Sequence, residues 1–138
     1  LAGLGVVAAV SDLYRTRAVG PDQPAYLNAV LVLECGCGPQ RLLQACHEIE
    51  RAEGRDRSSE PRWGPRTLDL DLLLLRRAVV ASDTLEIPHP RFPERAFALA
   101  PAADVAPGWV HPLLGRSVAD LAAAAIRREP DAVTKIEW

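Results

Sequence analysis

The sequence predicts a single domain of the α+β class. Its 138 residues suit one domain, and 49% hydrophobic with 25% charged residues can supply both a core and a solvated surface. Segments with the composition of strands alternate with segments whose apolar residues recur at helical spacing. Because strands and helices interleave and some strands lie close enough to form hairpins, we expect helices layered on a sheet.

The first half of the chain predicts two strands and one long helix. Residues 6–14 and 26–34 are apolar enough for strands, and the Gly and Pro residues of 15–24 predict a loop between them. Residues 39–52 predict a helix, because a proline suits its first turn and apolar residues follow at helical spacing. Gly54 should end this helix.

The middle of the chain predicts a loop, a strand and a short hairpin. Residues 55–66 are basic and poor in apolar side chains, which predicts an exposed, mobile loop. A strand should follow over 67–75, and 79–87 should form a hairpin or an edge strand. Residues 88–93 should be irregular, and 94–100 should form a short helix.

The last part of the chain predicts one more helix and one more strand. Residues 101–115 should be irregular or contain a short strand. Ser117 should cap a helix over 118–128, with Asp120 in the first turn favouring its N-terminus. A terminal strand is expected over 132–137.

Charge and hydropathy exclude several classes of protein. The net charge of −2 argues against a dedicated nucleic-acid binder, which tends to be basic. The sequence has no apolar run of 18 residues, so it predicts no membrane span. Its apolar start lacks the basic flank and the cleavage site of a signal peptide.

The three cysteines predict free thiols. Cys35 and Cys37 are separated by one glycine, and Cys46 lies further on. An odd count without a CxxC pair argues against a disulfide framework and a structural zinc site. Free thiols are typical of a reducing compartment, so we expect the chain in the cytoplasm.

A pair of carboxylates stands out in the strand predicted over 67–75. Leucine and aspartate alternate over 68–72, so Asp69 and Asp71 should share one face, with Cβ atoms about 6–7 Å apart. A cation would relieve their repulsion, and Mg²⁺ in phosphate chemistry takes one or two carboxylates. The alternative is a half-buried strand with two solvated aspartates, although aspartate is disfavoured in strands.

Four arginines precede this pair directly. They are Arg55, Arg57, Arg62 and Arg66. Guanidinium groups suit phosphates, and carboxylates that hold a metal beside arginines that hold phosphate are the parts of phosphoryl-type transfer. A solvated charged loop is the alternative for the arginines. Since the chain has no GxxxxGK[ST] motif, the sequence predicts a magnesium-dependent enzyme that uses ATP without a P-loop.

The run RWGPRTLDLD over 62–71 closely resembles the signature of the 6-hydroxymethyl-7,8-dihydropterin pyrophosphokinases, which act in folate biosynthesis. Further segments match this family in order, and they cover nearly the whole chain. These segments are 14–16, 20–24, 26–29, 50, 54–57, 87–90, 94–97 and 105–107.

The resemblance implies a ferredoxin-like α/β sandwich with a mostly antiparallel central sheet and helices packed on it. It also implies transfer of a pyrophosphoryl group from ATP to the hydroxymethyl group of the reduced pterin, with release of AMP. Two Mg²⁺ ions, small-molecule substrates and a monomeric chain without nucleic-acid or membrane partners are expected.

The resemblance assigns the catalytic roles. The residues concerned are Arg55, Arg66, Asp69 and Asp71. The two aspartates would hold the Mg²⁺ ions that bridge the ATP phosphates, and the two arginines would grip phosphates. Arg57 and Trp63 would close the loop over the site and exclude water.

The resemblance also assigns a pterin site. Its residues would be Thr16, Arg17, Val19, Tyr26, Asn28, Trp63, Asp69 and Phe97. Tyr26 and Phe97 would sandwich the flat ring, and Asn28 offers it both a donor and an acceptor. The alternative for the two aromatic residues is ordinary core packing.

The ATP site implied by the resemblance has eight residues. They are His47, Glu50, Arg57, Trp63, Arg66, Leu72, His89 and Arg95. The sequence departs from the family at His47, where glutamine is common, and at Pro90, where some members have an aromatic residue. Thr84 and Glu86 also differ from residues that can touch ATP. We expect these departures to affect nucleotide affinity, not the type of reaction.

The start of the chain is the main departure from the family. The family begins with a strand that carries Gly-Ser-Asn and then a helix, whereas this chain opens near the end of that helix and contains no methionine. We therefore expect an N-terminally incomplete domain over 1–138. The alternative functions are a pterin- or nucleotide-binding module without catalysis and, against the charge balance, another metal-dependent phosphoryl enzyme such as a nuclease.

Overall fold

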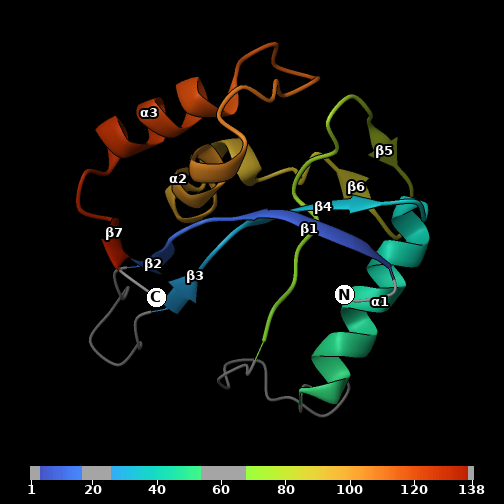
Figure 1. The fold of residues 1–138 in the computed structure, drawn as a ribbon. Coiled ribbons are helices and arrows are strands. Elements are labelled where there is room, and N and C mark those ends of the chain that lie inside the picture. The colour runs from blue at the N-terminus through green and yellow to red at the C-terminus, as the bar shows by residue number, and fades with distance from the viewer. Residues whose placement is uncertain (1–3, 17–25, 54–67, 137–138) are drawn as a thin grey trace.

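Two antiparallel strand pairs join the same two stretches of the first half, residues 5–16 and 26–35 (Figure 1). A computed structural model describes residues 4–16, 26–53 and 68–136. Strand β1 (Gly5–Val10) pairs antiparallel with β4 (Leu31–Cys35), and β2 (Leu13–Thr16) pairs antiparallel with β3 (Tyr26–Asn28). The two strands predicted over 6–14 and 26–34 are therefore each split in two.

Ser11 and Val30 mark the break between these two sheets. The Ser11 hydroxyl accepts a hydrogen bond from the Val30 N–H at 2.8 Å, and the Ser11 N–H donates to the Val30 carbonyl at 2.8 Å. The two stretches pair with each other on both sides of this break. The sequence predicted two long strands because the interruption depends on a hydroxyl–backbone contact between residues 19 positions apart.

The end of the chain returns to this region. Strand β7 (Val133–Ile136) pairs antiparallel with β2, which gives a sheet of order β3-β2-β7. It confirms the predicted terminal strand. Every strand pair in the described residues is antiparallel, and helices alternate with the strands, so the predicted α+β class is confirmed.

Helix α1 (Pro39–Ala52) has the predicted bounds. Gly38 is its N-cap and Pro39 occupies the first turn, where the missing N–H costs no hydrogen bond. The C-cap is Glu53, and the predicted stop at Gly54 lies outside the described residues. One face of the helix buries Ala45, Cys46 and Glu50.

The strand predicted over 67–75 is wrong for the described residues 68–75. They form no ladder with another described strand, and a strand needs such a ladder. Instead, the Leu73 carbonyl accepts from the His89 N–H at 2.8 Å, and the Leu70 N–H donates to a side chain of α1. The alternation of exposure is as predicted, with the leucines half-buried and Asp69 and Asp71 exposed.

The hairpin expected over 79–87 is confirmed. Strands β5 (Val80–Ala81) and β6 (Glu86–Ile87) pair antiparallel, and a short 3₁₀ turn, η1 (Phe92–Glu94), follows. The Ile87–Pro88 peptide bond between them is cis.

The core lies between helices α2 (Ala96–Val105) and α3 (Val118–Arg128). The prediction that α2 ends near residue 100 is wrong, because the helix continues through Pro101. Proline removes one helical hydrogen bond, but that whole turn is buried in the core, so packing outweighs the loss. Helix α3 has the predicted bounds, and Ser117 caps it by accepting from the Asp120 N–H at 3.1 Å.

Within the described residues, no helix has the length and apolar character needed to span a membrane. The cytoplasmic location stays a prediction.

Candidate functional site

A cavity of about 420 Å³ lies between α1, the β5–β6 hairpin and the segment that carries the aspartates. Helix α1 contributes Leu43 and His47, which are four residues apart and so face the same side. The other walls are 70–72, 82–86 and 89–90. Elements far apart in the sequence therefore meet around one hollow.

The cavity brings together four of the residues predicted to act on ATP and metal. His47, Asp71, Leu72 and His89 all line it. Asp69 is exposed two residues before Asp71 and is not among the lining residues. The two carboxylates thus belong to one exposed stretch at the edge of the hollow.

Glu50 holds this stretch in place. Its carboxylate is buried, with 1% of the residue exposed, and its Oε2 accepts from the Leu70 N–H at 2.8 Å. Leu70 is the residue between the two aspartates, so this bond fixes the backbone from which both side chains project. Because a ligand cannot reach a buried carboxylate directly, the geometry favours a positioning role for Glu50 over the predicted contact with ATP.

The environment of this part of α1 is negative. Burial raises the pKa of the Cys46 thiol, and the carboxylates of Glu50 and Asp71 raise that pKa further. Three acidic groups, Glu50, Asp69 and Asp71, therefore lie on or beside the same short stretch. Such a concentration of negative charge favours a bound cation.

The fit of this site to magnesium can be tested on its donors. No group of three or more His, Cys, Asp or Glu side chains within the described ranges could hold a metal by itself. Asp69 and Asp71 supply exposed carboxylate oxygens, and Mg²⁺ is commonly bound by one or two carboxylates together with phosphate oxygens and water. The pair fits an ion that is completed by a phosphate ligand.

The wall opposite α1 is fastened to that helix by side chains. The Gln40 amide donates to the Ser82 hydroxyl at 3.2 Å and accepts from the Thr84 hydroxyl at 3.3 Å. Ser82 also accepts from the Leu85 N–H at 3.2 Å inside the β5–β6 turn. This contact was not predictable from the sequence, because it joins residues about 40 positions apart.

Three of the residues predicted to bind pterin, Thr16, Tyr26 and Asn28, lie on a second surface. Tyr14 pairs with Asn28 and Thr16 pairs with Tyr26 across β2 and β3, and the Asn28 amide donates to the Thr16 hydroxyl at 2.8 Å. Tyr26 is 55% exposed, so its ring is available to a ligand and is not a core side chain. None of these residues lines the 420 Å³ cavity.

Phe97 and Arg95 form a pair at the start of α2. The Arg95 guanidinium carbon lies 5.4 Å from the centroid of the Phe97 ring, within the range of a cation–π contact. Phe97 is half-buried against the core, and α2 contacts β3, which carries Tyr26. Neither residue lines the cavity.

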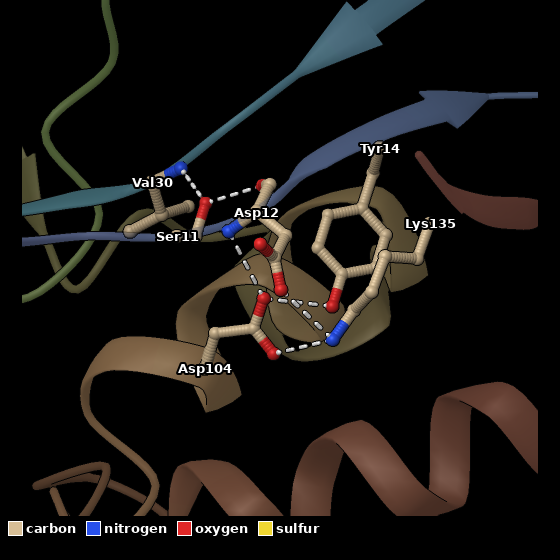
Figure 2. A network of polar contacts seen from close by, with 6 residues as sticks. All are labelled: Ser11, Asp12, Tyr14, Val30, Asp104 and Lys135. Atoms are coloured by element: carbon tan, nitrogen blue, oxygen red, sulfur yellow. Dashed lines mark hydrogen bonds and ion pairs between the residues drawn. The ribbon is translucent and has the colours of Figure 1, made fainter. Parts of the chain in front are cut away.

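A polar network that the sequence did not predict connects β2, which pairs with β3, to helix α2 and strand β7. Figure 2 shows Asp104 of α2 pointing toward Tyr14 and Lys135. One Asp104 oxygen accepts from the Tyr14 hydroxyl at 2.8 Å, the other lies 3.5 Å from the Lys135 ammonium, and Lys135 also pairs with Asp12 at 3.1 Å.

This network ties β2 to α2 and β7. Burial first, and then the hydrogen bond to Asp104, raise the pKa of Tyr14. The hydrogen bond to Asp12 is the main cause that raises the pKa of Lys135. Both groups therefore keep their protons at neutral pH, and the phenol donates while the ammonium stays charged.

Six residues of the predicted site lie outside the described ranges and stay predictions. They are Arg17, Val19, Arg55, Arg57, Trp63 and Arg66.

Comparison with known proteins gives one consistent family. The family model described as 7,8-dihydro-6-hydroxymethylpterin-pyrophosphokinase matches residues 1–107. Three relatives carry the name 2-amino-4-hydroxy-6-hydroxymethyldihydropteridine pyrophosphokinase. The Synechocystis relative is 41% identical over 126 residues, which cover 88% of this chain and 64% of the relative.

The other two relatives are bacterial as well. The Pseudomonas aeruginosa protein is 44% identical over 86% of this chain and 72% of its own length. The Bacillus subtilis protein is 44% identical over 72% of this chain and 59% of its own length. The chain thus spans less than two thirds of the length of two of these three relatives.

Proposed function

Because the chain belongs to the 7,8-dihydro-6-hydroxymethylpterin-pyrophosphokinase family, we propose that it transfers a pyrophosphoryl group from ATP to 6-hydroxymethyl-7,8-dihydropterin. The products are the pterin diphosphate and AMP, and the reaction belongs to folate biosynthesis. The observation that carries the proposal is the exposed Asp69 and Asp71 pair, anchored by Glu50 at the edge of a cavity lined by two histidines.

Asp69 and Asp71 are the proposed magnesium ligands, for two ions. Bound there, Mg²⁺ would offset the negative charge of the phosphates during transfer. The protein's part is to hold both carboxylates side by side. The Glu50 bond to the Leu70 N–H supports this role, because it fixes the intervening peptide.

The 420 Å³ cavity is the proposed site for ATP. Its size lies in the usual range for small-molecule sites of roughly 300–1,000 Å³. Leu43 and Leu72 provide apolar wall, while Ser82 and Thr84 offer hydroxyls. The backbone N–H of His89 donates to the Leu73 carbonyl, so His89 lies beside the segment that carries Asp69 and Asp71. His89 also lines the cavity and is the proposed phosphate contact.

The β2–β3 surface is the proposed pterin site. Thr16 and Asn28 already share a hydrogen bond, so the amide is oriented before a ligand binds. Tyr26 on β3 and Phe97 on α2 are the proposed stacking partners, supported by the contact between those two elements. Enclosing the hydroxymethyl group between these surfaces excludes water, which would otherwise compete as acceptor of the pyrophosphoryl group.

The test is to incubate the chain with ATP, Mg²⁺ and the reduced pterin alcohol and to separate the nucleotides. AMP should appear in equal amount with the pterin diphosphate. Formation of ADP would contradict pyrophosphoryl transfer. Binding of both ligands without product would identify a binding module instead of an enzyme.

Variants of Asp69 and Asp71 test whether this carboxylate pair holds the magnesium ions. Asp69→Asn and Asp71→Asn preserve size but remove a charge, and each should lower kcat by roughly 10²-fold or more, as loss of a transition-state charge contact does. Asp131→Asn, an exposed carboxylate in the turn before β7, is the matched control and should keep its rate. Full turnover by either site variant would remove the metal role from that residue.

A further inference from the structure

Two thiols face one another between β4 and α1, and neither lines the cavity proposed for ATP. Cys35 is the last residue of β4, and Cys37 directly precedes Gly38, the N-cap of α1. The Cys37 thiol donates to the Cys35 sulfur at 3.6 Å, and the Cys35 thiol contacts the Cys37 carbonyl at 3.7 Å. Both are free and half-buried, so a small reagent can reach them.

The distance between the two sulfurs indicates the angle at which a single atom could bridge them. If one atom bonds both sulfurs at about 2.3 Å, the length of a zinc–thiolate bond, a separation of 3.6 Å corresponds to an angle of about 100°, whereas a linear bridge would need about 4.6 Å. The observed 3.6 Å matches a bent bridge. The hydrogen bond to Cys35 also raises the pKa of Cys37, as expected for two sulfurs in direct contact.

The number of donors selects the kind of centre. No set of three or more His, Cys, Asp or Glu side chains in the described part of the chain could hold a metal. The described residues therefore do not supply the four protein ligands that a tetrahedral metal centre needs. A trivalent arsenic atom with one organic substituent has two bonds left, and two sulfurs complete it. Apart from the neighbouring Cys35 and Cys37, no described residue has an atom within 4 Å of the position that a Cβ on Gly36 would take, which leaves room beside the turn for the substituent.

We propose that Cys35 and Cys37 form a dithiol site that binds monosubstituted trivalent arsenicals as a bent two-sulfur chelate. In this reaction two S–H bonds break and two As–S bonds form, and the oxygen of the arsenical leaves as one water with the two protons. Arsenic stays trivalent, so no oxidant or reductant is consumed. The site is independent of the proposed enzymatic function.

Phenylarsine oxide is the probe. The folded chain is treated with one equivalent, then with excess 2-mercaptoethanol, and its intact mass is measured. One phenylarsenic group per chain should survive the monothiol, because the second sulfur acts at a high effective concentration. Cys35→Ser and Cys37→Ser should each bind roughly 10²-fold more weakly. Cys46→Ser removes the third thiol of the chain, which is buried in α1, and should bind like the wild type.

Peptide mapping of the wild-type adduct keeps the test decisive if a serine variant does not fold, which circular dichroism will reveal. The arsenical should be found on the peptide that contains both Cys35 and Cys37. The proposal is overturned if the monothiol strips the wild type, if the label resides on Cys46, or if a folded single-thiol variant binds as tightly as the wild type.

Discussion

Glu50 is a buried acid whose effect reaches the site through a backbone bond. Burying a carboxylate is costly unless hydrogen bonds compensate, and the bond from the Leu70 N–H provides one. Leu70 stands between Asp69 and Asp71, so the conformation of both aspartates depends on α1. The acid thereby couples the helix to the proposed metal ligands without contacting the metal.

Replacing Glu50 tests this positioning role. Glu50→Gln keeps an acceptor for the Leu70 N–H and should retain most of kcat. Glu50→Ala removes it, and should lower the free energy of unfolding by about 1–3 kcal/mol and raise the Mg²⁺ concentration needed for half-maximal rate. Urea titration and a magnesium titration of the rate measure the two effects. If Gln is as damaging as Ala, the charge itself is required and the positioning role is wrong.

At single residues, the sequence was informative where the relevant contacts are local. The alternation of leucine and aspartate predicted which side chains of 68–72 are exposed, because side-chain direction follows from neighbours in the chain. The role of Glu50 depends on a residue 20 positions away, and the roles of Gln40 and Asp104 depend on partners still more distant. Periodicity carries no record of such contacts.

At the scale of elements, β2 occupies the position on which the proposed pterin surface depends. It lies between β3 and β7, and Thr16 at its end hydrogen-bonds Asn28 of β3. The network in Figure 2 holds the other end of this strand to α2 through Tyr14 and Asp104. The strand is thus fixed on both edges and on the side that faces the helix.

Tyr14→Phe tests how much this attachment contributes. The variant keeps the ring that lies 5.6 Å from the Lys135 ammonium and loses only the hydroxyl that donates to Asp104. Because the acceptor is charged, we expect a loss of about 1.5–3 kcal/mol in the free energy of unfolding, measured by urea titration. Tyr26→Phe is the control, since the exposed Tyr26 should lose less than about 0.5 kcal/mol. Equal losses in the two variants would show that the Asp104 bond is not stabilising.

Helices α1 and α3 were predictable because their start signals are local. Pro39 and Ser117 act on the first turn that follows them. Three features were not predictable in this way: the splitting of the N-terminal strands, the absence of a ladder between 68–75 and another described strand, and the passage of α2 through Pro101. Each depends on partners that are distant in the sequence, and packing against those partners outweighs local preference.

At the scale of the whole molecule, residues 106–117 connect the two core helices α2 and α3. His111 lies at the centre of this connection and is 3% exposed. The backbone N–H of His111 donates to the Arg116 carbonyl at 2.9 Å, and the ring Nδ1 accepts from the backbone N–H of Leu113 at 3.3 Å. The second bond requires an unprotonated Nδ1, so the connection depends on the neutral form of the ring.

This dependence predicts how the stability of the molecule changes with pH. Burial lowers the pKa of His111 below its usual value near 6.5. As pH falls below about 6.5, the unfolded chain binds a proton at this histidine before the folded chain does, so acid favours unfolding. The stability that the neutral His111 provides is fully present above that pH. Below it, protonation of His111 in the unfolded chain should reduce the free energy of unfolding by at most about 1.4 kcal/mol per pH unit.

His111→Asn isolates this contribution. The asparagine Oδ1 can accept from the Leu113 N–H in place of Nδ1, and it does not titrate. Urea titrations from pH 8 to pH 5 should give parallel stability curves for variant and wild type above pH 7, where the ring is neutral in both states. Below pH 6.5 the wild type should lose stability more steeply. Curves that remain parallel down to pH 5 would mean that the folded molecule accommodates the charged ring, and that the helix connection opens or rearranges around it.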